Sequence, residues 1–247
     1  MGRLVRIGAL VAVCLLALAG AAEAKSKRGI DVSRFQGTIK WAQVGQTKNL
    51  FAFVQASRGS GDDCLVVPED CGTDAFYAAN YRGAKRVGIR VGAYHRAFAS
   101  GATSEAAKLD AREEANLFIN EVGKVRSKDL RPALDVESPF DNMSEESLRT
   151  WISAWLRRVE KKLGVKPIIY TNNSSWLETG NTRSFAEEGY RLWVANFDVP
   201  SPLVPADNWA GEGWAVWQYT SSGKVRGIDG NVDKNRLSGG LGPISAG

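Results

Sequence analysis

The sequence predicts one α/β domain whose strands close into a barrel. Apolar strand-like segments alternate with helical periodicities through the first two thirds of the chain, and this alternation is typical of βα units in a parallel sheet. The last third has further strand-like segments, joined by loops that contain Pro, Gly and Asp. A chain of 247 residues is also of a length at which barrels form a single domain. We therefore expect eight strands, with five helical crossovers that cease in the last third.

The strand candidates are short apolar segments bounded by turn residues. In chain order they are GIDVS at 29–33, LFAFVQAS at 50–57, GIRVGAYHRA at 88–97, RPALDVE at 131–137, KPIIYTN at 166–172, RLWVANF at 191–197, WAVWQYT at 214–220 and NVDKN at 231–235.

The clearest helix candidate covers residues 145–163, where large apolar residues recur at steps of four and three. Ser144 can cap its start, two glutamates favour its first turn, and Gly164 follows its end. A second apolar stripe predicts a helix that begins near Ser104. A third helix is expected near residues 74–86, and a short one after Trp41.

The N-terminus is expected to be removed before folding. Arg3 and Arg6 precede the apolar run 7–22, and the AEA sequence at 22–24 has the form of a signal-peptidase site. The run is too short for a membrane span. We therefore expect residues 1–24 to be a signal peptide, residues 25–237 to be the catalytic barrel and residues 238–247 to be a Gly-rich tail. The protein is expected in the periplasm or the extracellular space, without a stable membrane anchor.

Cysteine and histidine content restricts the chemistry. Without the signal peptide, Cys64 and Cys71 remain in a Gly- and Asp-rich loop, and we expect them to form one disulfide. The single histidine, His95, is more often a packed or hydrogen-bonded residue than a catalyst. It cannot build a two-histidine metal site. Acid and base chemistry is therefore expected from carboxylates, with no metal or cofactor.

Two carboxylates stand on one strand, in RPALDVESPF at 131–140. Asp135 and Glu137 are two positions apart, so they share a face, with α-carbons roughly 6.6 Å apart. Enzymes use such pairs when the two carboxyls take up protons at different pH. Asp31 ends the first strand, while Asp229 and Asp233 flank the eighth. Barrel enzymes work at the carboxyl ends of their strands, so these acids could converge on one mouth.

The residues resemble those of the glycoside hydrolase family 25 lysozymes, which are N-acetylmuramidases. Seven segments carry the resemblance, in order over nearly the whole mature chain: GIDVSRFQGTIKW, FAFVQASRG, GAYHRAF, ALDVE, IIYTNNSSW, LWVANF and AVWQYTSSGKVRGIDGNVDKN. The resemblance implies a modified TIM-like (β/α)5β3 barrel. It also implies hydrolysis of the β-1,4 bond between N-acetylmuramic acid and N-acetylglucosamine in peptidoglycan.

Carried over by position, the catalytic acid of the family corresponds to Glu137, with Asp135 and Asp31 beside it. The fourth carboxylate is Asp233, with Asp229 as its rival. Asp135 could orient the acetamido group of the substrate for attack, which we prefer, or it could position a water in an inverting reaction. Sugar binding needs aromatic faces and amides. The candidates are Tyr94, Tyr170, Trp193, Trp217, Gln218 and Tyr219, although Trp193 and Trp217 suit a core equally well, because aromatic residues in strands usually pack inside.

One position departs from the family pattern. Where the family commonly has K-x-T-E-G after the second strand, this chain has QASRG, so Arg58 replaces a glutamate. We expect this change to shift glycan preference or pH optimum.

Partners and alternatives follow from the charge and the acids. A formal net charge of +5 is mildly basic and interspersed, which fits an anionic polymer such as a cell-wall glycan at least as well as nucleic acid. We expect peptidoglycan glycan strands as partner, no nucleic acid, and a monomer. The alternative is a non-catalytic glycan-binding protein on the same barrel, which the presence of all four acids argues against. A carbohydrate esterase is disfavoured by the single histidine.

Overall fold

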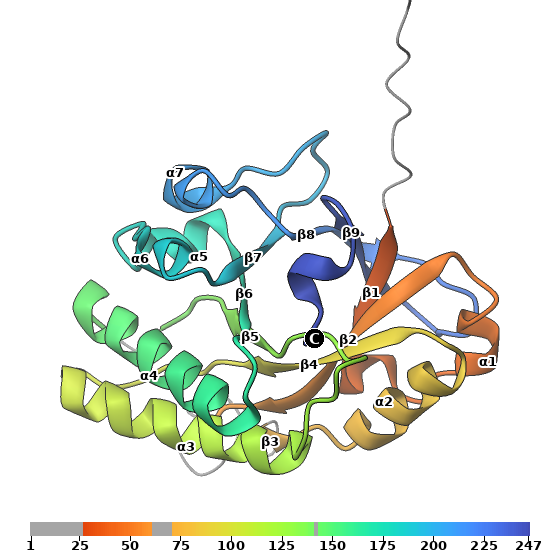
Figure 1. Ribbon diagram of the computed structural model, residues 1–247, viewed down its shortest axis with the longest axis horizontal. Helices are drawn as coiled ribbons and strands as arrows, with labels where there is room; N and C mark the ends of the chain where they lie inside the picture. Colours follow the sequence, from red (N-terminus) through yellow and green to blue (C-terminus); the bar gives the residue numbers. More distant parts are fainter. Residues whose placement is uncertain (1–26, 61–70, 141–142) are drawn as a thin grey trace, which may run out of the picture.

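A closed barrel of eight strands forms the centre of the molecule (Figure 1). The computed structural model describes residues 27–60, 71–140 and 143–247. The barrel strands are β1 (Arg28–Val32), β2 (Asn49–Arg58), β4 (Arg90–Arg96), β5 (Ala133–Val136), β6 (Ile168–Asn172), β7 (Arg191–Ala195), β8 (Val216–Gly223) and β9 (Val232–Leu237). The ring closes because β1 pairs with both β2 and β9. A two-residue strand, β3 (Gly72–Thr73), pairs antiparallel with the end of β2. The predicted eight-stranded α/β barrel is confirmed.

The direction of β9 decides which residues face each other across the seam. The barrel strands β1, β2 and β4 to β8 run parallel to one another, whereas β9 runs antiparallel to both β8 and β1. In the β1–β9 pair, Asp31 lies directly opposite Asp233. Two acids that are 202 positions apart in the sequence are thereby neighbours at the same end of the barrel.

Aromatic rings fill the barrel interior. Phe53 stacks on Trp193 with ring centroids 4.5 Å apart, and Tyr170 meets the same indole edge-on at 4.7 Å. Gly92 is required by this filling, because a Cβ there would lie 2.6 Å from the ring of Phe53. The barrel interior is therefore closely packed around these aromatic rings.

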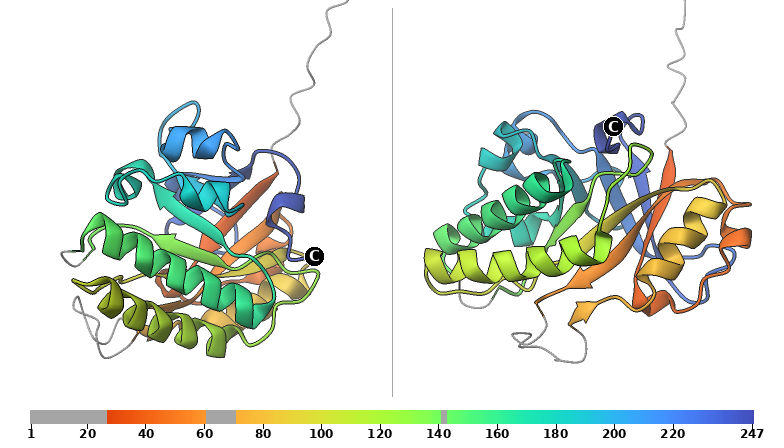
Figure 2. Two further views of the ribbon diagram at one scale, coloured as in Figure 1. Left: turned by 60° about the vertical axis from the view of Figure 1, so that its left-hand side comes forward. Right: turned by 60° about the horizontal axis from the view of Figure 1, so that its bottom comes forward.

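Helices cover the outside of the barrel. They are α1 (Trp41–Val44), α2 (Tyr77–Arg86), α3 (Ser104–Val122), α4 (Glu145–Leu163), α5 (Asn173–Leu177), α6 (Ser184–Glu187) and α7 (Pro205–Ala210). α3 and α4 lie side by side on one flank (Figures 1 and 2). α4 has the predicted bounds, with Ser144 accepting a hydrogen bond from the amide of Ser147 and Gly164 ending it at φ 71°. Gly164 takes this left-handed conformation without the steric penalty of a side chain.

The last third does contain helices, but they are short. α6 has four residues and α7 has six, too few to produce a periodic apolar pattern. α7 is left-handed, since φ lies between 52° and 55° from Ala206 to Ala210. This conformation costs roughly 1–2 kcal/mol per residue. It is held by Trp209, which is buried against Trp176 at 5.0 Å and donates to the carbonyl of Tyr190.

The Gly-rich C-terminal segment 238–247 packs against the barrel. Ile244 is fully buried in the interior cluster, and its carbonyl accepts a hydrogen bond from the amide of Arg131 at 2.7 Å. The amide of Ala246 binds the carbonyl of Asp129. Because these contacts are made next to the start of β5, the segment closes the end of the barrel opposite the carboxyl ends of the strands (Figure 1).

Some expectations fall on residues outside the described ranges. These are the signal peptide at 1–24 and the Cys64 half of the expected disulfide with Cys71. Both stay predictions. Within the described part of the chain, no helix combines the length and apolar character needed to cross a bilayer.

Candidate active site

A cleft of about 330 Å³ opens at the carboxyl ends of the strands. All four carboxylates that the sequence analysis selected line it: Asp31 from β1, Asp135 and Glu137 from the end of β5, and Asp233 from β9. The rival Asp229 is exposed and does not line the cleft. The other lining residues are Ser33, Phe35, Gln36, Gln55, Arg58, Tyr94, Arg96, Tyr170, Trp193, Phe197, Gln218 and Ser221.

Asp31 and Asp233 form a pair of carboxyls joined by a hydrogen bond. Asp31 is only 4 % exposed. Gln218 Nε2 donates to both of its oxygens at 3.1 Å, and Asn235 Nδ2 donates to Oδ2 at 2.6 Å. Burial raises the pKa of Asp31 from 3.8 to about 6, against the lowering effect of these donors.

The partner acid holds its proton more strongly. Burial, and then the charge and hydrogen bond of Asp31, raise the pKa of Asp233 from 3.8 to about 9. Two carboxyls in contact cannot both ionise without mutual repulsion. Between about pH 6 and 9 the pair therefore carries one negative charge and one proton, with the proton on Asp233.

Asp135 is buried and lines the same cleft as the pair. Burial raises its pKa well above the ordinary value, Arg96 opposes this rise, and the charges of Glu137 and Asp31 add to it. The nearest cation is the guanidinium of Arg96, whose Nη1 lies 3.8 Å from Asp135 Oδ1. This distance is too long for a hydrogen bond, so Asp135 is a poorly solvated acid with an attractive but loose counter-ion.

Glu137 is held by one amide donor, lies near a tyrosine hydroxyl, and is less buried than Asp135. Asn172 Nδ2 donates to its Oε1 at 3.0 Å, and the hydroxyl of Tyr170 lies 3.5 Å from the same oxygen. That hydroxyl donates to Gln218 Oε1 at 2.9 Å. A chain of contacts thus runs from Glu137 through Tyr170 and Gln218 to Asp31.

Comparisons with known proteins agree with this geometry. The family model described as "Glycosyl hydrolases family 25" matches residues 30–228, most of the chain. This chain belongs to glycosyl hydrolase family 25. Its relatives include "Lysozyme M1" of Streptomyces globisporus, 31 % identical over 228 residues that cover 89 % of this chain and 70 % of that protein. The crystal structure of the bacterial lysozyme from Streptomyces coelicolor superposes with a TM-score of 0.74 at 30 % identity, covering 90 % of this chain and 96 % of that one.

A third relative comes from Escherichia coli. The "Uncharacterized protein YegX" of Escherichia coli (strain K12) is 34 % identical over 216 residues, covering 85 % of this chain and 69 % of that protein.

The family 25 enzyme places four of the six expected sugar-binding side chains in the cleft. Tyr94, Tyr170, Trp193 and Gln218 line it. Trp217 and Tyr219 do not, because side chains alternate along β8 and Gln218 between them points inward. Trp217 instead donates to the carbonyl of Asn196 and packs outside the barrel.

Several residues of the site were not foreseen from the sequence. Asn172 binds Glu137 and also caps α5, with its Oδ1 accepting from the amide of Ser175. Asn235 is held by Trp193 Nε1 at 2.8 Å and in turn holds Asp31. A signal for both existed in the sequence: Asn172 ends a strand next to that of Glu137, and Asn235 shares a strand face with Asp233.

The rim of the cleft carries aromatic and cationic side chains. Among them is Arg58, at the position where the family pattern has a glutamate. The Arg58 guanidinium lies 4.9 Å from the ring centroid of Phe98 and 5.9 Å from that of Phe35. Phe35 is 73 % exposed. Arg96 lies 5.6 Å from Phe98 on the same side. Two cations thus border the cleft, and both lower the pKa of Asp135.

His95 lies behind the cleft wall and is fully buried. Its Nδ1 is 2.8 Å from the hydroxyl of Ser57, and its Nε2 is 2.6 Å from a carboxyl oxygen of Glu114. Burial lowers the pKa of His95 to about 3 and raises the pKa of Glu114 to about 8. The two groups therefore meet as neutral imidazole and protonated carboxyl at neutral pH. The expectation of a packed, hydrogen-bonded histidine is confirmed.

Proposed function

We infer that this family 25 hydrolase is a lysozyme that cleaves the β-1,4 bond between N-acetylmuramic acid and N-acetylglucosamine in peptidoglycan. The observation that carries this inference is one cleft that holds Glu137, Asp135 and the Asp31–Asp233 pair at the end of the barrel where the parallel strands terminate. Lysozyme M1 of Streptomyces globisporus and the Streptomyces coelicolor lysozyme, both named for this activity, support it.

Glu137 is the proton donor in this proposal. Asn172 and Tyr170 both contact Oε1, which fixes the rotation of the carboxyl while the side chain still lines the cleft. A positioned carboxylic acid can pass its proton to the departing glycosidic oxygen as the bond from that oxygen to C1 breaks. The leaving sugar then departs as a neutral alcohol.

Asp135 assists the sugar on the other side of that bond. It is the acid best placed to accept a hydrogen bond from the N–H of the substrate's 2-acetamido group, because none of the described residues places a donor within hydrogen-bond distance of its Oδ1. This contact turns the acetamido oxygen toward C1, where it forms the bond that replaces the glycosidic one. Water then attacks C1, returns the acetamido group and gives its proton to Glu137.

The Asp31–Asp233 pair supplies a single negative charge near the reacting centre. A positively charged, oxocarbenium-like transition state is stabilised by a fixed negative charge in a site from which water is partly excluded. Gln218 and Asn235 hold that charge on Asp31. The remaining proton on Asp233 prevents a second charge, which would repel its neighbour.

Export belongs to the same proposal. Peptidoglycan lies outside the cytoplasmic membrane, so we propose that residues 1–24 direct the chain to the periplasm or the extracellular space. The oxidising environment there suits a disulfide between Cys64 and Cys71.

The proposal is tested by digesting purified peptidoglycan and analysing the soluble fragments by mass spectrometry, with and without borohydride reduction. Fragments with reduced muramic acid at their ends are expected. Fragments reduced at glucosamine would assign the cleavage to the other glycosidic bond. If the protein binds the polymer and releases nothing, it is a glycan-binding protein on a hydrolase fold.

A further inference from the structure

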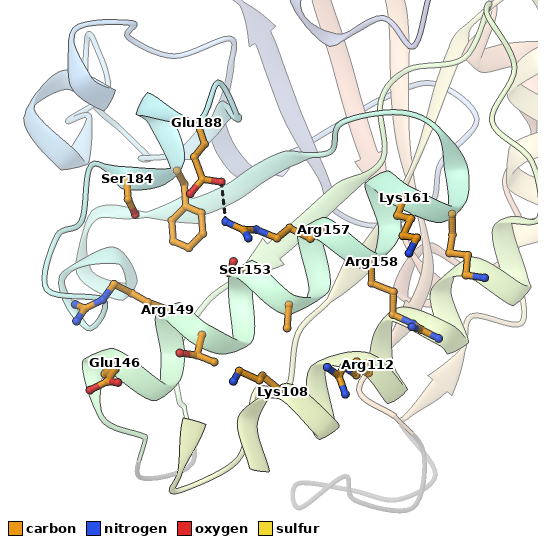
Figure 3. Close-up of a pocket in the computed structure, with 14 residues that line it drawn as sticks. Lys108, Arg112, Glu146, Arg149, Ser153, Arg157, Arg158, Lys161, Ser184 and Glu188 are labelled. Carbon is orange, nitrogen blue, oxygen red and sulfur yellow. Dashed lines mark ion pairs between the residues drawn. The ribbon is translucent and has the colours of Figure 1, made fainter. Parts of the chain in front are cut away.

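A second cavity, larger than the cleft, lies on the outer flank of the barrel (Figure 3). It has a volume of about 870 Å³ and shares no lining residue with the cleft. It is lined by α3, α4 and the segment around α6, through Lys108, Arg112, Glu146, Arg149, Thr150, Ser153, Ala154, Arg157, Arg158, Lys161, Lys162, Ser184, Phe185 and Glu188. We call this cavity the flank groove.

The flank groove is strongly cationic. Seven of its lining residues are Lys or Arg and two are Glu. The formal net charge of the whole chain is +5. The groove residues alone account for this excess, so the positive and negative charges of the other residues cancel. Such a concentration of one sign raises the local density of oppositely charged ligands.

Only part of this positive charge is neutralised by the protein itself. Lys108 pairs with Glu105, Arg149 with Glu145 and Arg157 with Glu188. Three further exposed cations, Arg112, Lys161 and Lys162, have no ion pair or side-chain hydrogen bond within the described part of the chain. An anionic ligand can therefore bind these three without breaking an existing contact.

The cations form a line. Arg149, Arg157 and Lys161 stand at multiples of four residues along α4, with the hydroxyl of Ser153 between the first two. Each step of four residues advances about 6 Å along a helix, so the line extends over about 18 Å. Lys108 and Arg112 form a second row at the same spacing on the neighbouring α3 (Figure 3). The cations of both rows stand at multiples of about 6 Å, which suits a linear ligand whose anions repeat at that spacing or a multiple of it.

We propose that the flank groove binds a linear phosphodiester polymer of the cell wall, of the polyol phosphate type. Guanidinium groups match phosphate oxygens as paired donors, and successive phosphates of an extended polyol phosphate chain are spaced comparably to the cations. Single-stranded nucleic acid fits less well, because its sites add exposed aromatic rings for base stacking. The one aromatic ring in the lining, Phe185, is 3 % exposed.

This site would hold the enzyme on its substrate. A wall polymer bound on the flank leaves the cleft free, because the two cavities have no residue in common. Binding through a second contact raises the effective concentration of the cleft near the glycan strands. The identity of the polymer as a wall component rests on the proposed lysozyme function, whereas the anion site itself does not.

The test compares two triple variants of the full protein. Arg112→Gln, Lys161→Gln and Lys162→Gln together remove the three unpaired groove cations. Arg82→Gln, Lys124→Gln and Lys128→Gln together remove three exposed cations elsewhere and serve as the control. Affinity for fluorescent poly(glycerol phosphate) is measured by anisotropy at two salt concentrations. The groove variant is expected to bind about tenfold more weakly and with a smaller salt dependence, while the control binds like the wild type.

Three results would overturn the proposal. The first is equal binding by the groove variant and the wild type. The second is equal weakening in the control, which would indicate net charge alone. The third is equal or tighter binding of poly-L-glutamate or single-stranded DNA of the same charge, which would assign the groove to another polyanion. Hydrolysis of peptidoglycan stripped of wall polymers is expected to be unchanged in the groove variant. If the wild type also fails to hydrolyse it, the lysozyme function fails and the binding result still stands.

Discussion

The retained proton of the Asp31–Asp233 pair makes the stability of the protein depend on pH in a way that one substitution removes. Asp233 has an ordinary pKa of 3.8 in the unfolded chain and a pKa of about 9 in the fold. The folded protein therefore keeps a proton that the unfolded chain releases. Its contribution to stability is complete below about pH 4 and is lost as the pH rises toward 9.

The magnitude follows from one proton. When a group is protonated only in the folded state, each unit by which the pH rises lowers the free energy of unfolding by about 1.4 kcal/mol. Between pH 5 and 8 this amounts to about 4 kcal/mol, and the partial exposure of Asp233 to solvent reduces it to roughly 2 kcal/mol. Asp233→Asn cannot titrate, but its amide can still donate to Asp31. The variant is therefore expected to lose that much less stability than the wild type between pH 5 and 8.

Urea denaturation at pH 5, 6, 7 and 8 measures the difference. Other buried acids, such as Asp110 and Glu114, contribute equally to both proteins and cancel. Asp229→Asn is the matched control, because it makes the same substitution four residues away, outside the cleft. Parallel curves for the wild type and Asp233→Asn would refute the shared proton. A flattened curve for Asp229→Asn would show that the effect is general charge.

Three further variants test other parts of the structure. Asn172→Asp keeps the cap of α5 but removes the donor to Glu137. We expect kcat to fall at least tenfold with an unchanged melting temperature, and full activity would contradict the positioning role of Asn172. Ala210→Gly relieves the backbone strain of a residue at φ 53° and should raise the free energy of unfolding by about 1 kcal/mol. Ala154→Gly, within the right-handed helix α4, should lower the free energy of unfolding by about as much. Equal effects of the two substitutions would show that Ala210 is not strained. Arg58→Glu removes a charge that lowers the pKa of Asp135, so the pH profile of kcat/KM should move to higher pH, and an unchanged profile would show that Arg58 does not act on the cleft.

The fold was predictable where the pattern was long or repeated. α4 has the expected bounds because nineteen residues carry a full apolar stripe, a serine cap and a terminal glycine. The eight strands followed from apolar segments between turn residues. α6 and α7 were missed because four to six residues cannot show a period. Ile244 was missed because a single apolar residue in a Gly-rich segment gives no signal of burial.

The site was predictable only as far as strand ends reveal it. The four carboxylates were identified because barrel mouths collect the residues at the ends of strands. Their partners depend on register across strands, which sequence does not specify. Asp31 meets Asp233 because β9 pairs antiparallel with β1. Asn235, which also lies on β9, donates a hydrogen bond to Asp31. The alternation that places Gln218 inside and Trp217 outside is fixed by the same register.

The most direct test of the account is the rate at which Glu137→Gln releases fragments from purified peptidoglycan. Glutamine keeps the shape and the contacts with Asn172 but carries no acidic proton. Glu178→Gln is the control, since Glu178 contacts Ser138 next to Glu137 and lies outside the cleft. We predict a loss of at least 100-fold for Glu137→Gln, with intact binding to the polymer, and wild-type rates for Glu178→Gln. Wild-type release by Glu137→Gln would contradict the central claim.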